Sequence, residues 1–208
     1  NREKYKEILS TFKNISVRES QGQKIIKDLI GKDVPVVLDP TLLLNKSDWE
    51  KSIDYKFENK EKYILIYSLS HSEKILEHAK ILSKKTGLKI KYIKTSLRKG
   101  IGAENIYNAG PEDFIKLFLG AEYVLTNSFH GTAFSINFNK NFFVELDTVA
   151  KVSSRITNIL TALNLENRII DEKTQKKITE PISYEYANKK LNQLRKDSIH
   201  YLKNLFNQ

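Results

Sequence analysis

Residues 123–136 have the sequence YVLTNSFHGTAFSI, and this stretch indicates the fold. An apolar run stops at small and polar residues, a single histidine and a glycine follow, and apolar residues then resume. Such a pattern predicts a short buried strand, a tight turn and a helix. The strand is expected at 122–127 and the helix at 131–138. Asn127 or Ser128 would cap this helix, which leaves His130 and Gly131 in its first turn.

The same alternation extends over most of the chain. Strands are expected at 14–17, 34–38, 63–69, 88–93, 104–108, 122–127 and 141–146. Helical periods are expected at 20–30, 71–86, 111–120 and 184–206, and the second of these helices has Ser72 and Glu73 near its start and Gly87 as its stop. Strands that are apolar on both faces and alternate with helices indicate a parallel sheet covered on two sides. The predicted fold class is therefore α/β, with a Rossmann-like parallel sheet flanked by helices.

One Rossmann-like unit is expected at 62–170. Residues 1–38 form a helix–strand–helix–strand piece that could belong to another sheet. Residues 39–62 are turn-prone at their start and highly charged at their end, which suits a crossing between two domains. The chain begins within a charged, helix-like stretch, and we expect it to be part of a longer protein.

The amino-acid composition favours anionic binding partners but does not indicate which one. The net charge is +10, from 35 basic and 25 acidic residues, and it suits anionic partners such as phosphate-bearing small molecules, acidic polysaccharide, a membrane face or nucleic acid. The basic residues are spread along the chain, so most are expected to form a solvated surface. The absence of cysteine excludes disulfides and thiolate metal sites, and permits a cytosolic setting. No metal is expected, because no carboxylate pair or histidine cluster has ligand spacing.

His130 has two interpretations from the residues alone. Ligands of open parallel sheets bind beyond the carboxyl ends of the strands, and a helix N-terminus there suits a phosphate or carboxylate. His130 could then bind an anion or move a proton, while Gly131 would let the backbone approach a ligand. Alternatively, His130 bonds a neighbouring carbonyl and Gly131 merely relieves crowding. The second interpretation is favoured without further support.

Four segments together resemble the polysaccharide pyruvyl transferase family. They are SVRE (16–19), VVLDPTLLL followed by Trp49 (36–49), the stretch 110–143 around SFHG, and SSRITNILTALNLENR (153–168). They stand in the family's order, and SFHG within its long context is the most specific of them. The resemblance implies the C-terminal half of a GT-B-type two-domain fold. Residues 1–60 would be a remnant of the N-terminal domain plus the interdomain crossing, 61–183 the Rossmann-like donor-binding domain, and 184–208 a C-terminal amphipathic helix.

The resemblance also implies an activity. Such an enzyme moves the enolpyruvyl unit of phosphoenolpyruvate onto a sugar of a bacterial-type surface polysaccharide and leaves a pyruvate ketal. Phosphoenolpyruvate is then the donor substrate, and no cofactor is implied. The acceptor would be a sugar or a lipid-linked oligosaccharide, and no nucleic acid is expected as a partner. The implied location is the cytoplasm, where a lipid-linked acceptor could bring the enzyme to the inner face of the membrane. The incomplete chain could be inactive by itself.

The family's histidine falls on His130, which becomes the catalytic candidate, either as proton donor or as phosphate ligand. The arginine of SVRE falls on Arg18, which the resemblance places near the cleft as a partner for a carboxylate or phosphate. Without the family, a surface ion pair with Glu19 or another neighbour would be expected for Arg18.

The other donor-binding candidates are Asn127, Ser128, Phe129, Gly131 and Arg155. Asn127 and Ser128 are expected to be helix caps first, and Arg155 could equally be a surface residue at a helix start. Some family members carry an arginine two residues before the histidine, where this chain has Ser128. One expected anion clamp is therefore absent, which leaves donor binding open.

Two other functions remain open. A GT-B-type glycosyltransferase would use a nucleotide sugar, and Glu112 could bind its ribose. A non-catalytic module would hold an anionic polymer on its basic surface. Elsewhere, Asp39 is expected to bond the N–H groups of its own turn. Residues 98–105 lack the spacing of a phosphate loop and are predicted to be a plain connection.

Overall fold

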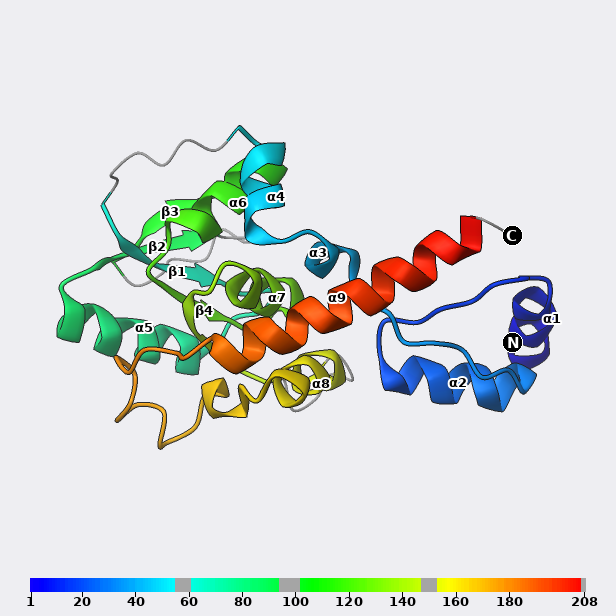
Figure 1. The fold of residues 1–208 in the computed structure, drawn as a ribbon. Coiled ribbons are helices and arrows are strands. Elements are labelled where there is room, and N and C mark those ends of the chain that lie inside the picture. Colours follow the sequence, from blue (N-terminus) through cyan, green and yellow to red (C-terminus); the bar gives the residue numbers. More distant parts are fainter. Residues whose placement is uncertain (55–60, 94–101, 147–152, 207–208) are drawn as a thin grey trace. The chain divides into compact units, whose positions relative to one another are not determined.

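The computed structural model describes residues 1–54, 61–93, 102–146 and 153–206 (Figure 1). The chain divides into two compact units, of which the first contains Asn1–Leu43 and Glu185–Gln208 and the second contains Leu44–Tyr184. The domain boundaries implied by the resemblance, after residues 60 and 183, stay a prediction. So does the prediction for residues 98–101, which lie outside the described part of the chain.

The second unit is built on a five-stranded sheet with the order β3-β2-β1-β4-β5 (Figure 1). All neighbouring strands are parallel. The strands are β1 (Tyr63–Tyr67), β2 (Lys89–Ile93), β3 (Glu104–Ile106), β4 (Tyr123–Thr126) and β5 (Asn141–Val144). The chain runs outward from β1 to β3 and then returns past β1 to β4 and β5, so the strand order reverses between β1 and β4. This is a doubly wound sheet, and the predicted Rossmann-like α/β class is confirmed.

One face of the sheet packs against α5 (Glu73–Thr86). The buried cluster on this face contains Ile64, Ile66, Ile75, Leu76, Ala79, Leu82, Ile90, Tyr92, Leu125, Phe143 and Ile178. The helix begins where Ser72 Oγ accepts a hydrogen bond from the Ile75 N–H at 3.0 Å, and it ends at Gly87, whose φ is +74°. Both the start and the stop expected from the sequence are confirmed.

The opposite face carries α6 (Pro111–Gly120) and α7 (Phe129–Asn137). Successive residues of a strand point to opposite faces, so Tyr67 points away from the α5 side on which Ile66 lies. Its ring meets Phe114 and Phe118 of α6, which in turn contact Phe134 of α7. Trp49 of α4 (Lys46–Ser52) contacts Phe134 edge-on, with 5.3 Å between the ring centroids. Aromatic packing therefore fixes α7 on the sheet.

After β5, the second unit continues through α8 (Ser153–Leu163) and the short helix η1 (Glu166–Arg168). Helix α8 packs against α7. Beyond η1, Ile169 forms an isolated parallel bridge with Val144 at the edge of the sheet.

The first unit contains α1 (Arg2–Ser10), α2 (Ser20–Ile30), α3 (Pro40–Leu43) and α9 (Glu185–Phe206). The two strands expected at 14–17 and 34–38 are wrong, because only one parallel bridge, between Val17 and Val36, joins these segments. Pro35 has no N–H with which to extend a ladder. Side chains of α9 bind this backbone instead: Ser198 Oγ accepts from the Leu38 N–H at 3.0 Å, and Arg195 Nε donates to the Leu42 carbonyl at 2.8 Å.

Lys140 lies at the amino-terminal edge of the sheet, between α7 and β5. Its Nζ donates a hydrogen bond to the Leu119 carbonyl in the last turn of α6, at 2.6 Å. Burial, together with the positive charge of Lys46, lowers the pKa of the Lys140 ammonium to about 8. Burial therefore favours the neutral amine in the folded chain.

We expect the free energy of unfolding to rise by about 2 kcal/mol between pH 8 and pH 10 because of Lys140. In this range the unfolded chain, whose lysine has the ordinary pKa of 10.5, binds a proton that the folded chain has released. Below pH 8 both states bind it, so the contribution is lost there. Urea unfolding of Lys140→Met should lack the rise, whereas Lys80→Met, at an exposed position of α5, should keep it. An equal rise in both variants would contradict this assignment.

Candidate functional site

The candidate site lies where β1 and β4 run side by side and the strand order reverses. Two loops leave the carboxyl ends of these strands, residues 68–72 toward α5 and residues 127–128 toward α7. Because α5 and α7 cover opposite faces, the loops diverge. In α/β sheets of this type, ligands bind at this position.

Thr126, the last residue of β4, joins the two strand ends. Its Oγ1 donates to the Tyr67 carbonyl at 2.6 Å and accepts from the Ser128 N–H at 3.0 Å. The residue is fully buried. These bonds fix the turn between β4 and α7 relative to β1.

Asn127 connects the two loops. Its Oδ1 accepts from the Leu69 N–H at 2.8 Å, and its Nδ2 donates to Ser70 Oγ at 3.0 Å. Helix α7 begins at Phe129, two residues earlier than expected, and Ser128 holds the N-cap position without a side-chain capping bond. The prediction of Ser128 as the N-cap residue, with His130 and Gly131 in the first turn, is therefore confirmed, although its side chain makes no capping bond. Asn127 is not the cap, and its amide binds the neighbouring loop instead.

Gly131 is buried where α7 approaches the strands most closely. A Cβ atom at this position would overlap Thr126 Oγ1 and would lie only 3.0 Å from Thr126 Cβ and 3.1 Å from Tyr67 Cδ1. Packing of the helix on the strand ends thus requires a glycine, as the interpretation based on crowding expected. A contact between the Gly131 backbone and a ligand stays a prediction.

His130, Phe129 and Arg155 come together at the start of α7. His130 is exposed in the first turn, and its ring meets the edge of the buried Phe129 ring at 5.5 Å between centroids. Arg155, from the first turn of α8, places its Cζ 3.9 Å from the centre of the same Phe129 ring. An imidazole and a guanidinium therefore flank one aromatic ring beside the positive end of a helix. This arrangement suits an anion.

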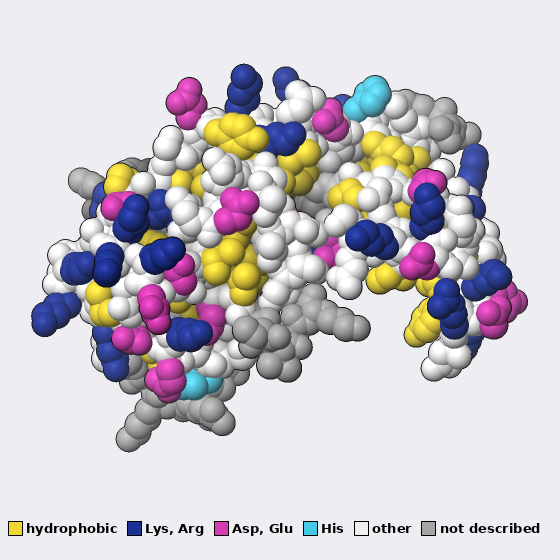
Figure 2. All heavy atoms as spheres, turned by 90° about the horizontal axis from the view of Figure 1, so that it is seen from below, with side chains coloured by type: hydrophobic (Ala, Val, Ile, Leu, Met, Phe, Trp, Pro, Cys, Tyr) yellow, Lys and Arg dark blue, Asp and Glu magenta, His cyan; other side chains and the backbone are white. Residues whose placement is uncertain are grey.

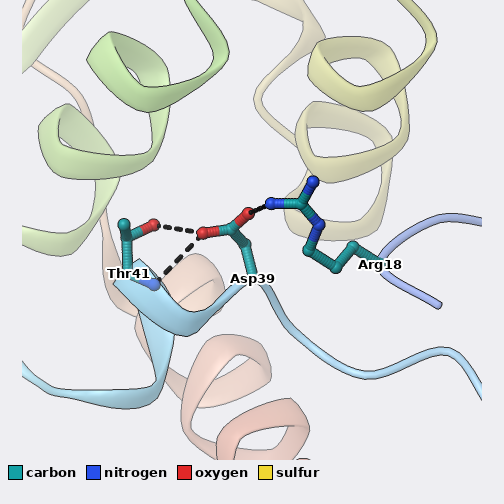
Figure 3. A network of polar contacts seen from close by, with 3 residues as sticks. All are labelled: Arg18, Asp39 and Thr41. Atoms are coloured by element: carbon teal, nitrogen blue, oxygen red, sulfur yellow. Dashed lines mark hydrogen bonds and ion pairs between the residues drawn. The ribbon is translucent and has the colours of Figure 1, made fainter. Parts of the chain in front are cut away.

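Arg18 lies in the first unit, where its Nη1 donates to Asp39 Oδ2 at 2.6 Å (Figure 3). Asp39 Oδ1 accepts from the Thr41 N–H at 3.1 Å and from Thr41 Oγ1 at 2.8 Å. Burial acts to raise the pKa of the Asp39 carboxyl, but the hydrogen bonds from Thr41 and Arg18 outweigh it and hold this pKa below its usual value. The turn role expected for Asp39 is confirmed, and its carboxylate is the ion-pair partner of Arg18. Its placement near the cleft stays a prediction.

The loop after β1 was not singled out from the sequence. Ser68 is buried and its Oγ donates to the Ser70 carbonyl at 2.5 Å, while exposed His71 places Nε2 2.6 Å from Glu73 Oε1. The sequence feature that could have indicated it is SLSHS (68–72), a largely polar stretch directly after β1. It resembles TNSFHG (126–131), which lies at the end of β4. Both stretches carry a histidine, and the structure makes their strands neighbours.

Two of the cavities formed by described residues lie elsewhere. One of about 460 Å³ is lined by Phe143, Arg168 and the segment that follows η1, and one of about 390 Å³ is lined by α1 and α2. Neither is lined by a predicted site residue. Within the described residues, no group of His, Asp and Glu is arranged to hold a metal ion. The expectation that no metal takes part stays a prediction.

The charged surface does not form one basic patch on the face that Figure 2 shows. Lysine and arginine side chains are interspersed there with aspartate and glutamate, as expected for a solvated surface. None of the described helices has both the length and the apolar composition that crossing a membrane requires.

The sheet and its turns define a doubly wound α/β protein with a histidine in the first turn of the helix at its switch point. The family model of polysaccharide pyruvyl transferase matches residues 1–144, more than half of the 208-residue chain. The chain belongs to this family, as the resemblance indicated. The match ends before Arg155, so the part of the resemblance at 153–168 lies beyond it.

No curated protein matches the chain. Among solved structures, UDP-GlcNAc 2-epimerase from Neisseria meningitidis bound to UDP-GlcNAc is similar, with 14% identity and a TM-score of 0.36. The similarity covers 76% of this chain and 48% of that one, so the chain spans about half the length of the epimerase. A likeness this weak carries no argument about function.

Replacing Gly131 by alanine should destabilise the second unit by about 2–3 kcal/mol, because the added methyl group has no room beside Thr126. Gly110→Ala is a matched control at the start of α6, where the new Cβ would meet its nearest atom, Asp113 Oδ2, at an ordinary 3.7 Å. Urea unfolding measures both variants. An equal free energy of unfolding for Gly131→Ala and Gly110→Ala would contradict the close approach of α7 to the strand ends.

Removing the Asn127 side chain should free the loop after β1. In Asn127→Ala, we expect amide hydrogen exchange at Leu69 to accelerate about tenfold or more, because that N–H loses its acceptor. Asn127→Asp retains an acceptor oxygen and should keep Leu69 protected. The Ser128 amide, which is bound by Thr126, is the internal control in the same NMR experiment. Unchanged exchange at Leu69 in the alanine variant would rule out this bracing role.

Proposed function

We propose that the chain is part of an enzyme that transfers the enolpyruvyl group of phosphoenolpyruvate to a sugar of a surface polysaccharide and closes a pyruvate ketal. Family membership supports a polysaccharide pyruvyl transferase. The identity of the donor, phosphoenolpyruvate, and of the product, a pyruvate ketal, is part of what we propose. We further propose that the acceptor is a sugar or a lipid-linked oligosaccharide, and that the reaction takes place in the cytoplasm, at the inner membrane face if the acceptor is lipid-linked.

The place of His130 is the observation that carries the proposal at the level of residues. It is exposed in the first turn of α7, directly after the strand at which the sheet order reverses. The first N–H groups of a helix have no intrahelical acceptor and attract anions. A group that can hold or deliver a proton near neutral pH is thus placed where a phosphate or carboxylate is favoured.

The proposed chemistry needs a proton donor and an anion clamp. Protonation of the methylene carbon of phosphoenolpyruvate makes C2 electrophilic, and a sugar hydroxyl adds there and releases its proton. Phosphate then leaves with the electron pair of the C2–O bond, and a second hydroxyl adds to C2 and releases its proton to complete the ketal. His130 would donate the first proton or hold the phosphate. Arg155, held on Phe129, would supply a guanidinium beside it.

Arg155 could take the place of the arginine that some family members carry at position 128, where this chain has a serine. Ser128 is buried under the turn, whereas the Arg155 guanidinium reaches the neighbouring Phe129 from α8. The positive charge beside the first turn of α7 can thus come from Arg155 of α8. Donor contacts by Asn127, Ser128, Phe129 and Gly131 remain part of the proposal, through backbone or ring atoms.

The nucleotide-sugar alternative would need Glu112. This side chain is exposed in the first turn of α6 and pairs with Lys116 at 3.3 Å. A thermal-shift comparison of phosphoenolpyruvate with nucleotide sugars separates the two donors, and stabilisation by nucleotide sugars alone would overturn the proposed function. A polymer-binding module would instead show a steep salt dependence of binding.

In the complete protein with its acceptor, His130→Ala should reduce phosphate release from phosphoenolpyruvate by about 10²–10⁴-fold, the usual contribution of a positioned proton donor. His130→Gln separates the two roles. A phosphate ligand replaced by glutamine should mainly raise KM, whereas a lost proton donor should mainly lower kcat.

His200→Ala, which removes an exposed histidine of α9, is the control and should leave turnover unchanged. Circular dichroism and thermal unfolding should show that all three variants fold. Normal phosphate release by folded His130→Ala would refute the catalytic role.

A further inference from the structure

The carboxylate of Asp39 is buried, and hydrogen bonds within its own turn hold it independently of Arg18. Only 3% of the residue is exposed, and Oδ1 is held by the N–H and the hydroxyl of Thr41, two residues further along the same turn. These bonds leave Oδ2 directed at Arg18 (Figure 3). The orientation of the carboxylate is therefore set by the turn.

Arg18 offers more donors than Asp39 uses. A guanidinium carries five N–H donors in a rigid plane, and the bond to Asp39 engages Nη1. The other terminal nitrogen is directed away from the carboxylate in Figure 3. The Arg18 side chain is 51% exposed although its partner is buried. A fixed guanidinium edge is thus presented to solvent.

An ion pair that only neutralised Asp39 would not require this arrangement. A lysine could supply the same charge, whereas a planar fork is needed to bind a carboxylate or phosphate through two parallel hydrogen bonds. Holding the fork in place before a ligand arrives also lowers the entropy lost on binding.

We propose that Asp39 is a positioning residue that orients the Arg18 guanidinium, so that its remaining N–H groups bind the carboxylate or phosphate of an anionic substrate. The proposal rests on the proposed function, in which that substrate is phosphoenolpyruvate. Thr41 belongs to the same device, because it fixes the Asp39 carboxylate.

The test compares Arg18→Lys and Asp39→Asn with the wild type in the complete protein. Lysine keeps the charge and can keep the ion pair, but it loses the fork. Asparagine keeps an acceptor for Thr41 but turns an amide toward Arg18. For both variants we expect KM for phosphoenolpyruvate to rise about tenfold or more with kcat within about threefold, since a good bidentate contact acts mainly on binding. Asp33→Asn, which breaks the exposed Lys27–Asp33 pair of the same unit, is the matched control and should leave KM unchanged.

Binding of inorganic phosphate and of pyruvate, measured by calorimetry, separates this inference from the proposed function. If the wild type does not turn over phosphoenolpyruvate but binds either anion, and Arg18→Lys loses that binding, the proposed function fails and the Arg18 site stands. If turnover is normal in the wild type and KM is unchanged in folded Arg18→Lys and Asp39→Asn, the inference is overturned while the function stands. Lower thermal stability without a change in KM would likewise reduce the pair to a structural ion pair.

Discussion

The first turn of α7 lies directly on the carboxyl ends of β1 and β4, at a separation that leaves no room for a Cβ atom at position 131. The rest of the site depends on this contact. Thr126 joins the two paired strand ends and accepts the Ser128 N–H, and the same side chain is the one that a Cβ atom at position 131 would overlap. The same approach leaves His130 at the exposed side of the turn while its neighbours on both sides are buried. A tightly packed interior transmits such a constraint because it has few voids in which to relax.

The residues that the sequence suggested as binding groups serve two different purposes in the structure. Asn127 and Gly131 build the frame, the first by tying the loop after β1 and the second by allowing close packing. Arg155 and His130 contact the same Phe129 ring and are placed where an anion would be favoured. A polar residue beside a catalytic candidate is therefore often a support for it, and supports determine geometry as firmly as contacts do.

In the first unit, hydrogen bonds from side chains replace a sheet. Ser198 and Arg195 of α9 take up backbone groups of the segment that ends at Leu42, since the two neighbouring segments share only the bridge between Val17 and Val36. The turn that carries Asp39 lies in this segment, and its hydroxyl and amide donors keep a buried carboxylate ionised. A buried charge of this kind persists only with such partners, which is why Arg18 and Thr41 belong to one network.

The sequence by itself determined the alternation of strands and helices, the ends of α5 at Ser72 and Gly87, and the position of His130 after a strand, because local periodicity and capping chemistry encode them. It also carried the family resemblance. It could not determine that β4 lies beside β1, since strand pairing depends on contacts between residues about sixty positions apart. For the same reason the loop with His71, the partner of Asn127 and the stacking of Arg155 on Phe129 were decided only by the tertiary structure. The expected strands at 14–17 and 34–38 failed on the same ground, because an apolar run becomes a strand only where a neighbouring strand can pair with its backbone.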